Sequence, residues 1–235
     1  MKYTLEIRMA GERMVGIIED ENGNQQEVSE FYQQTWSEQL NEMNLKAMGS
    51  FFQMFVQKIT KHLPKRSDIT TIQLHDNIDG WAFLDKNGQT LQSANFRNEL
   101  LPTFTGYLKA MRLNGIVGQL ERKAGAEFSV NTPLLAALWF KNEHADQYEK
   151  LAYFVSFQEY LHYLFTGKNQ IMPHLAARTG LYDLRHNGWD PQALAFVGFN
   201  EKMLPDVVKV EDFEDQIIPE FSKKLGLNKD TKIKW

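Results

Sequence analysis

The sequence predicts a mixed α/β fold with one central sheet, flanking helices and a mainly helical second half. Short apolar runs at residues 3–7, 14–18 and 25–28, with turn-type residues before the last, indicate a three-stranded meander. From about residue 37 to residue 62, apolar residues recur at helical spacing instead. Strands that are followed by a long helix, further strands and then a series of helices are typical of a layered α/β domain.

The remaining elements follow from local signals. The long helix should end at Leu63-Pro64, because proline cannot continue a helix. Residues 69–78 and 81–84 return to a strand pattern, and the sequence DKNG at 85–88 is typical of a turn. Beyond Ser93 we expect helices at 100–111, 115–122 and 133–141. We interpret the Met and Phe stripe at 43–59, and Trp81, as core residues.

Composition excludes several classes of protein. The chain has 235 residues, of which 43% are hydrophobic and 24% charged, as in ordinary globular proteins with a sizeable core. A formal net charge of -4, without a basic cluster, argues against nucleic acid as a partner. The absence of cysteine excludes disulfides and favours a reducing cytoplasm. No apolar run reaches the length of a membrane span, so we expect an untargeted cytoplasmic protein that does not bind membranes.

The chain has no linker, repeat or metal-binding spacing. Its six histidines include no H-x-x-x-H or H-E-x-x-H pattern, so no metal site is expected. We predict one domain over residues 1–235. Its parts are a strand-rich core with one long helix at 1–92, a mainly helical part at 93–210 and a terminal segment at 211–235.

Residues 176–207, AARTGLYDLRHNGWDPQALAFVGFNEKMLPDV, are the most informative stretch. Asp190-Pro191 predicts a helix start, because the carboxylate can cap free N–H groups and proline presets the first helical φ. Gly198 is placed to end that helix with a positive φ. Amphipathic helices and turns therefore account for the residue types, but they do not account for the order of the pieces.

That order resembles the FGGY carbohydrate kinases. In their first domain, a K/Q-x-Y-L-x-x-x-L-T-G helix precedes A-S-R-T-x-L-x-D-L and W-D-x-x-L-x-x-x-G-x-x-x-x-x-L-P-x-V. Here residues 157–167 read FQEYLHYLFTG, and PLLAALWFKNEHAD from Pro133 is similar to a further helix of the family. The resemblance is most specific at 132–208. It implies the ribonuclease-H-like half of an actin-like ATPase fold, which in the family phosphorylates a sugar or polyol hydroxyl with ATP and Mg²⁺. Arg178, Thr179 and Asp183 would then be scaffold residues.

The first hairpin departs from the family pattern. The family has G-x-D-x-G-T-T-S-x-K, and this chain has EIRMAGERMV at 6–15. Arg8 stands in place of the aspartate that organises magnesium, and Glu12 and Arg13 replace hydroxyl residues. A glutamate repels a triphosphate, and bulky side chains hinder approach of the backbone to phosphates. ATP and Mg²⁺ are therefore implied by family resemblance only, with no tight binding expected. We interpret the hairpin as an ordinary one with a charged solvent face.

The sugar-contacting motifs are also altered. HDNIDG at 75–80 stands where the family has S-x-Q-x-H-G, and FRNEL at 96–100 stands where it has W-x-D-x-R. Leu100 replaces an arginine and removes a planar set of donors. A third motif, T-D-x-x-x-A-S in the family, has Met172 instead of its acid. The substrate-binding candidates that remain, for a sugar or polyol, are His75, Asp76, Asp79 and Asn98.

Two functions stay open from the sequence. Residues 226–233 resemble the segment that precedes the family's catalytic aspartate, which would lie beyond Trp235 together with the adenosine-binding domain. We therefore assign no catalytic residue. The first hypothesis is the N-terminal domain of a carbohydrate kinase, not catalytic as this isolated chain and paired with a C-terminal kinase domain. The second is a pseudokinase domain with a structural, regulatory or weak sugar-binding role. A homodimer is a further partner to test.

Overall fold

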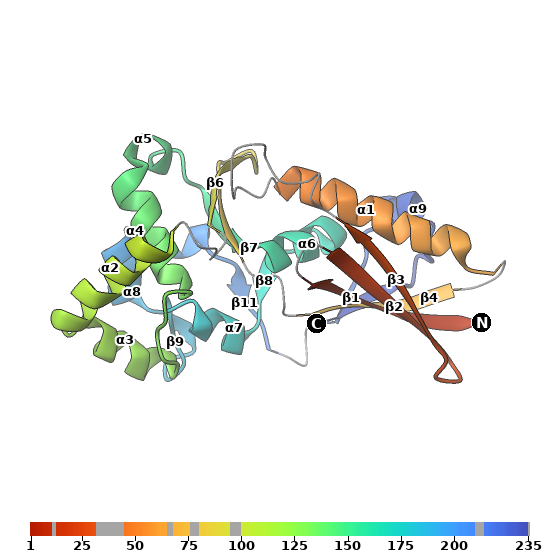
Figure 1. Ribbon diagram of the computed structural model, residues 1–235, viewed down its shortest axis with the longest axis horizontal. Helices are drawn as coiled ribbons and strands as arrows, with labels where there is room; N and C mark the ends of the chain where they lie inside the picture. The colour runs from red at the N-terminus through yellow and green to blue at the C-terminus, as the bar shows by residue number, and fades with distance from the viewer. Residues whose placement is uncertain are drawn as a thin grey trace. The chain divides into compact units, whose positions relative to one another are not determined.

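The chain divides into two compact units whose segments interleave along the sequence (Figure 1). Unit 1 comprises Met1–Asp79, Phe157–Asn169 and Glu211–Trp235, and unit 2 comprises Gly80–Ser156 and Gln170–Val210. The computed structural model describes residues 1–10, 13–31, 45–64, 68–75, 80–94, 100–209 and 214–234. The single domain at 1–235 and its three parts stay predictions; the described residues 214–234 supply strands and a helix to unit 1.

Unit 1 contains a six-stranded mixed sheet. Its strands run in the order β12 (Glu214–Gln216), β13 (Lys232–Lys234), β4 (Asp68–Leu74), β1 (Lys2–Ala10), β2 (Arg13–Asp20) and β3 (Gln25–Phe31). The three central strands β13, β4 and β1 are parallel, and the other neighbours are antiparallel. The predicted meander is confirmed. The strand predicted at 69–78 is described as far as β4 goes, because 76–79 lie outside the described residues.

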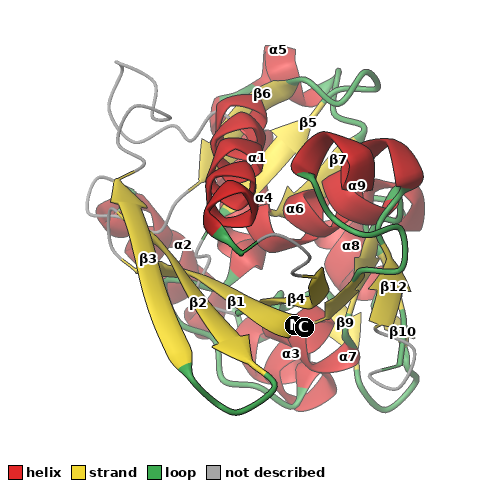
Figure 2. Ribbon diagram, turned by 90° about the vertical axis from the view of Figure 1, so that its right-hand side faces the viewer, coloured by secondary structure: helices red, strands yellow, loops and turns green. Residues whose placement is uncertain are grey.

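Helix α1 (Leu45–His62) lies across this sheet, as Figure 2 shows. Gly16 of β2 permits the close approach, since a Cβ there would lie 2.9 Å from Ile59 Cδ1. Phe52 of α1 meets Phe165 of α6 (Phe157–Thr166) with ring centroids 5.1 Å apart, and Phe165 also contacts Phe221 of α9 (Pro219–Leu225) at 5.2 Å. In the predicted Met and Phe stripe, Met48, Phe52 and Phe55 are buried in the core, Phe51 is partly buried and Met54 is exposed, whereas Met43 lies outside the described residues. Residues 37–44 of the predicted helix lie outside the described residues.

Unit 2 is mainly helical around a small antiparallel sheet. The sheet has the order β6 (Thr90–Ala94), β5 (Trp81–Leu84) and β7 (Tyr153–Ser156). Its helices are α2 (Leu101–Leu113), α3 (Ile116–Ala124), α4 (Pro133–Glu143), α5 (Ala145–Tyr148), α7 (Pro173–Arg178) and α8 (Pro191–Val197), with a 3-10 turn η2 (Glu201–Met203). Two short strand pairs complete it: β8 (Gln170–Ile171) with β11 (Asp206–Val207), and β9 (Tyr182–Asp183) with β10 (Gly188–Trp189).

The core of unit 2 is aromatic and centres on α4. This helix is buried from Pro133 to Phe140, and the Phe140 ring stacks on Phe83 of β5 at 4.1 Å between centroids. Trp81 is 7% exposed and stacks on Phe154 at 4.5 Å. These contacts confirm Trp81 as a core residue, and the three helices predicted for this half are present.

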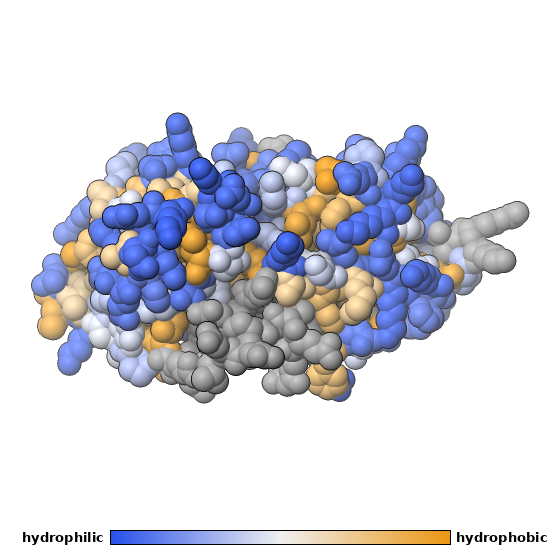
Figure 3. All heavy atoms as spheres, turned by 90° about the horizontal axis from the view of Figure 1, so that it is seen from above, coloured by the Kyte–Doolittle hydropathy of each residue, from blue (hydrophilic) through white to orange (hydrophobic). Residues whose placement is uncertain are grey.

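The described residues expose apolar side chains in separate groups. On the face that Figure 3 shows, hydrophilic side chains cover most of the coloured surface, and apolar ones lie between them. The exposed large apolar residues come from several elements: Met1, Phe31, Met54, Leu101, Leu113, Tyr153, Tyr163 and Leu184. Among the helices described, none is long and apolar enough to cross a membrane.

Candidate functional site

Polar side chains gather at the carboxyl ends of the parallel strands of unit 1. Because β1, β4 and β13 are parallel, their carboxyl ends lie at the same end of the sheet, and open α/β sheets usually bind ligands at that end. The register pairs Glu6 with Gln73 and Gln73 with Lys234, so these three share one face. Arg8 lies two residues beyond Glu6 on β1, and His75 lies two residues beyond Gln73, just after the end of β4, so both continue that face. Ile7 pairs with Gly16 on the face that α1 covers, so the polar row lies on the opposite face.

His75 is the predicted substrate-binding residue that the structure describes. Its backbone N–H donates to the carbonyl of Ile7 at 3.0 Å and so extends the pairing of β4 with β1. Its Nε2 lies 3.1 Å from Oε1 of Glu6, and both side chains are partly exposed. Nε2 itself is shielded from solvent and makes no hydrogen bond with the described residues, so Glu6 lies near this nitrogen without satisfying it. The other three candidates, Asp76, Asp79 and Asn98, lie outside the described residues, so their positions relative to His75 stay a prediction.

The first hairpin places Arg8 opposite an apolar residue. The register pairs Arg8 with Val15, Met9 with Met14 and Ala10 with Arg13, which leaves residues 11–12 between the strands. Arg13 turns toward β3, where its guanidinium carbon lies 4.1 Å from the centroid of the Phe31 ring. Arg13 therefore lies against an aromatic ring, whereas Arg8 stands opposite the apolar Val15. Glu12 lies outside the described residues.

Leu100 serves the helical core and not a polar pocket. It precedes α2, where its carbonyl accepts a hydrogen bond from the Phe104 N–H at 2.9 Å. Its side chain is partly buried and packs against the apolar core of unit 2. The position at which the family resemblance implies an arginine therefore offers no side-chain hydrogen bond here.

The signature stretch of unit 2 is held by structural hydrogen bonds. The Thr179 hydroxyl donates to the Ala176 carbonyl at 2.6 Å and accepts from the Leu181 N–H at 3.0 Å. Asp183 accepts from the Arg185 N–H at 2.9 Å and pairs with His186 at 2.8 Å. The hydrogen bond to His186 is the main cause that lowers the pKa of Asp183. Thr179 and Asp183 are thus scaffold residues, as expected, whereas Arg178 is exposed.

The start of α8 is also built as the sequence predicts. Asp190 caps the helix by accepting from the Gln192 N–H at 2.9 Å, and its carboxylate binds Nζ of Lys123 at 2.8 and 2.9 Å. Asp190 is 2% exposed. Gly198 ends the helix with φ of 77°. Both residues therefore position α8.

A buried histidine in unit 1 was missed by the sequence reasoning. His162 of α6 is 1% exposed, with Nε2 at 3.2 Å from Oδ2 of Asp215 and Nδ1 at 3.1 Å from the carbonyl of Lys168. The Lys168 ammonium pairs with the other oxygen of Asp215. Burial lowers the pKa of His162, against the opposing effects of the Lys168 carbonyl and Asp215. The available signal was a histidine on the apolar face of α6, but Asp215 is 53 residues away in sequence.

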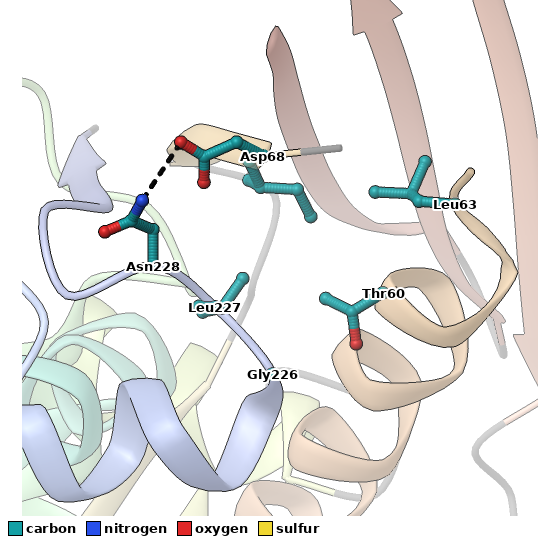
Figure 4. Close-up of a pocket in the computed structure, with 7 residues that line it drawn as sticks. Thr60, Leu63, Asp68, Gly226, Leu227 and Asn228 are labelled. Carbon is teal, nitrogen blue, oxygen red and sulfur yellow. Dashed lines mark hydrogen bonds between the residues drawn. The ribbon is translucent and has the colours of Figure 1, made fainter. Parts of the chain in front are cut away.

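A cavity of about 450 Å³ opens at the opposite end of the unit 1 sheet, where β4 begins (Figure 4). It lies between the end of α1, the start of β4 and the residues after α9. Oδ2 of Asp68 accepts a hydrogen bond from Nδ2 of Asn228 at 3.2 Å, as the dashed line marks. The lining residues are Thr60, Leu63, Asp68, Ile69, Gly226, Leu227 and Asn228. The cavity lies at the amino end of β4, so we do not assign the substrate site to it. Within the residues described, no cluster of His, Asp and Glu could hold a metal ion.

Comparisons with known proteins agree with this fold. Residues 10–234 match the FGGY family of carbohydrate kinases, N-terminal domain. A rhamnulokinase of Oceanobacillus iheyensis is 27% identical over 156 residues, which is 64% of this chain and 33% of the relative. A xylulose kinase of Staphylococcus xylosus is 20% identical over 169 residues, which is 71% of this chain and 34% of the relative.

Solved structures extend the likeness to the whole chain. The xylulose kinase from Lactobacillus acidophilus superposes with a TM-score of 0.86 at 22% identity, covering 100% of this chain and 47% of that one. The gluconate kinase from the same organism gives 0.85 at 22% identity, covering 99% and 47%. At these identities the likeness shows the fold. The chain spans about a third of the curated relatives and about half of the solved ones.

Proposed function

Since this chain belongs to the FGGY family of carbohydrate kinases, as an N-terminal domain, we propose that it is a kinase scaffold without kinase activity of its own. In the family, the reaction transfers the γ-phosphate of ATP to a hydroxyl of a sugar or polyol. A shared fold alone does not establish an activity, so the kinase scaffold of this chain does not imply that it transfers phosphate.

The observation that carries the proposal is Arg8 at the end of β1. A guanidinium cannot coordinate Mg²⁺, which takes carboxylate and phosphate oxygens. The nearest carboxylate on that face of β1, Glu6, lies against His75. Val15 stands opposite Arg8 and adds no oxygen. The residues described at these strand ends therefore do not fit Mg²⁺ with ATP, and we derive no phosphoryl-transfer step here.

A weak polyol site is the remaining binding role. His75, Asp76, Asp79 and Asn98 are the proposed contacts. Each polar group left unpaired in a closed pocket costs about 1–3 kcal/mol, and Leu100 cannot supply the donors that an arginine would. Affinity for a neutral sugar should therefore be low.

The second kinase domain is the proposed partner. The solved relatives are about twice as long as the part that this chain covers. In the family, that other half supplies the adenosine-binding domain, and closure of two domains excludes water from the reaction. We propose a structural or regulatory role toward such a domain in the cytoplasm. A homodimer remains a matter for measurement.

Sugar-dependent ADP release tests the proposal. The chain is incubated with ATP, Mg²⁺ and a panel of pentoses, hexoses, gluconate and glycerol, beside an active xylulose kinase as a positive control for the assay. We expect no ADP above the ATP blank, with at most a small thermal shift on adding sugar. Saturable, sugar-dependent turnover by the chain would show that the proposal is wrong.

A further inference from the structure

The cavity at the amino end of β4 is lined by Asp68, one of whose carboxylate oxygens has no partner among the described residues. The residue is partly buried, and its Oδ2 accepts the hydrogen bond from Nδ2 of Asn228 at 3.2 Å, as Figure 4 shows. No described lysine, arginine or histidine pairs with this carboxylate. A carboxylate accepts hydrogen bonds at both oxygens, so Oδ1 is available to a donor from a ligand.

The end of α1 adds negative potential to the same cavity. This helix of 18 residues ends at His62, and Thr60 and Leu63 line the cavity. The last four carbonyls of a helix lack partners within it and carry partial negative charge. In α1 these are the carbonyls of residues 59–62, which accept no hydrogen bond from any described residue outside the helix. Together with Asp68 they favour a positively charged ligand group.

The other walls of the cavity are apolar. Leu63, Ile69 and Leu227 contribute aliphatic side chains. The Thr60 hydroxyl donates to the Leu225 carbonyl at 2.9 Å, so it already serves to join α1 to α9. A volume of about 450 Å³ is within the usual range of small-molecule sites. A ligand that fits these walls carries one cationic group on a short aliphatic body.

The neighbouring lysines leave the Asp68 carboxylate open. Lys2 lies next to Asp68 in the strand register, and Lys61 and Lys229 adjoin lining residues of the cavity. All three are exposed, and none makes an ion pair with Asp68. Their charges reduce the attraction of a cation from a distance, so binding depends on direct contact within the cavity. A bare inorganic cation, which makes no apolar contact, should therefore bind poorly.

We propose that this cavity binds a primary aliphatic amine, with its ammonium at Asp68 and the end of α1 and its alkyl chain against Leu63 and Leu227. An ammonium has three N–H donors, which can serve both Oδ1 and helix carbonyls. The site is separate from the proposed sugar site, because it lies at the opposite end of β4. The inference goes beyond the proposed function and does not rest on it.

Nuclear magnetic resonance of the isotope-labelled chain tests the proposal. The chain is titrated with n-butylamine and putrescine, and with n-butanol and ammonium chloride as controls, at constant ionic strength and about pH 7, where alkylamines are protonated as lysine is. We expect saturable shifts of the Asn228 side-chain amide and of the Gly226 and Leu227 backbone amides with both amines. Butanol lacks the charge and ammonium lacks the alkyl chain, so each should bind about tenfold more weakly or less. Unmoved signals with both amines, or butanol binding as tightly as butylamine, overturn the proposal.

Two variants complete the test. Asp68→Asn removes the charge but keeps an oxygen for the hydrogen bond from Asn228, so it should weaken amine binding about tenfold or more. Asp230→Asn is the matched control: it removes the same charge from an exposed residue that does not line the cavity, and it should bind as the parent does. Equal binding by Asp68→Asn and the parent, or an equal loss in Asp230→Asn, overturns the proposal. If Asp68→Asn does not fold, Asp230→Asn and the direct signals of the parent decide. Neither ATP nor sugar is present, so failure here leaves the proposed lack of turnover untouched.

Discussion

The polar side chains of the signature stretch in unit 2 and those at the strand ends of unit 1 differ in how fully they are bound within the fold. Around α8, Asp190 is buried and bound by Gln192 and Lys123. At the end of β1, Nε of Arg8 is shielded and makes no hydrogen bond with the described residues, and Glu6 and His75 are partly exposed. The part of the chain that most resembles the kinases is thus the part whose polar groups stabilise the fold. The part that departs from them is where we propose that a ligand binds.

The largest expected effect is at the scaffold residue Asp190. Replacing it with alanine removes the cap of α8 and leaves Lys123 without its carboxylate, so the free energy of unfolding should fall by about 3 kcal/mol. Urea unfolding measures it. Asp190→Asn keeps the cap acceptor and should lose less, while exposed Asp146→Ala should change little. Equal stability of Asp190→Ala and the parent would mean that the pair does not hold α8.

The next largest difference is expected between glycine replacements in the two units, which should lower stability by different amounts. Gly198 has φ of 77°, and a Cβ there would lie 2.5 Å from the Tyr148 hydroxyl, which donates to the Val197 carbonyl. Gly198→Ala should cost about 2–3 kcal/mol, through strain and displacement of that hydroxyl. Gly23, in the hairpin of unit 1, has φ of 81° but nothing within 4 Å, so Gly23→Ala should cost about 1 kcal/mol. Similar losses in the two thermal unfolding curves would contradict this reading.

A smaller effect should follow from pH. Burial lowers the pKa of His162 in the folded chain, so the unfolded chain binds its proton more readily. Stability from this group is complete above the ordinary pKa of 6.5 and declines as the pH falls toward the lower folded value. The slope is at most about 1.4 kcal/mol per pH unit. Urea unfolding at about pH 7.5 and about pH 5.5 should show the loss, and His162→Gln should reduce it. If His162→Gln loses as much stability at low pH as the parent does, another group causes the loss.

The smallest effect is expected at Arg8. Because its guanidinium makes no described ion pair, Arg8→Gln should change the free energy of unfolding by about 0.5 kcal/mol or less. The comparison with Asp190→Ala, in the same urea titration, shows whether the strand ends are specialised for binding. A loss as large as that of Asp190→Ala would make Arg8 a scaffold residue.

Much of the fold was predictable because its signals are local. The meander, the turn at Asp85–Gly88, the cap at Asp190 and the helix end at Gly198 each depend on residues that are close in sequence. The interleaving of the two units was not predictable, because it depends on which distant segments pair. Thus β13 joins β4 across more than 150 residues.

The site was predictable only in part. The replacement of an acid by Arg8 is visible in the sequence, but the lack of a hydrogen bond from its Nε to the described residues is not, because that depends on how β1 pairs with β2 and β4. His162 and Asp215 likewise meet only through the fold. The proposed contacts at Asp76, Asp79 and Asn98 stay predictions.

The dependence of ATP binding on Mg²⁺ tests the central claim most directly. Isothermal titration of the chain with ATP, with Mg²⁺ and then with EDTA at equal ionic strength, compares the two affinities. A site that presents a guanidinium binds the bare phosphates at least as well, since Mg²⁺ masks their charge. Mg²⁺ is therefore expected to leave ATP binding unchanged or to weaken it. Binding that Mg²⁺ tightens would show that a kinase-type metal site persists, and would contradict the account.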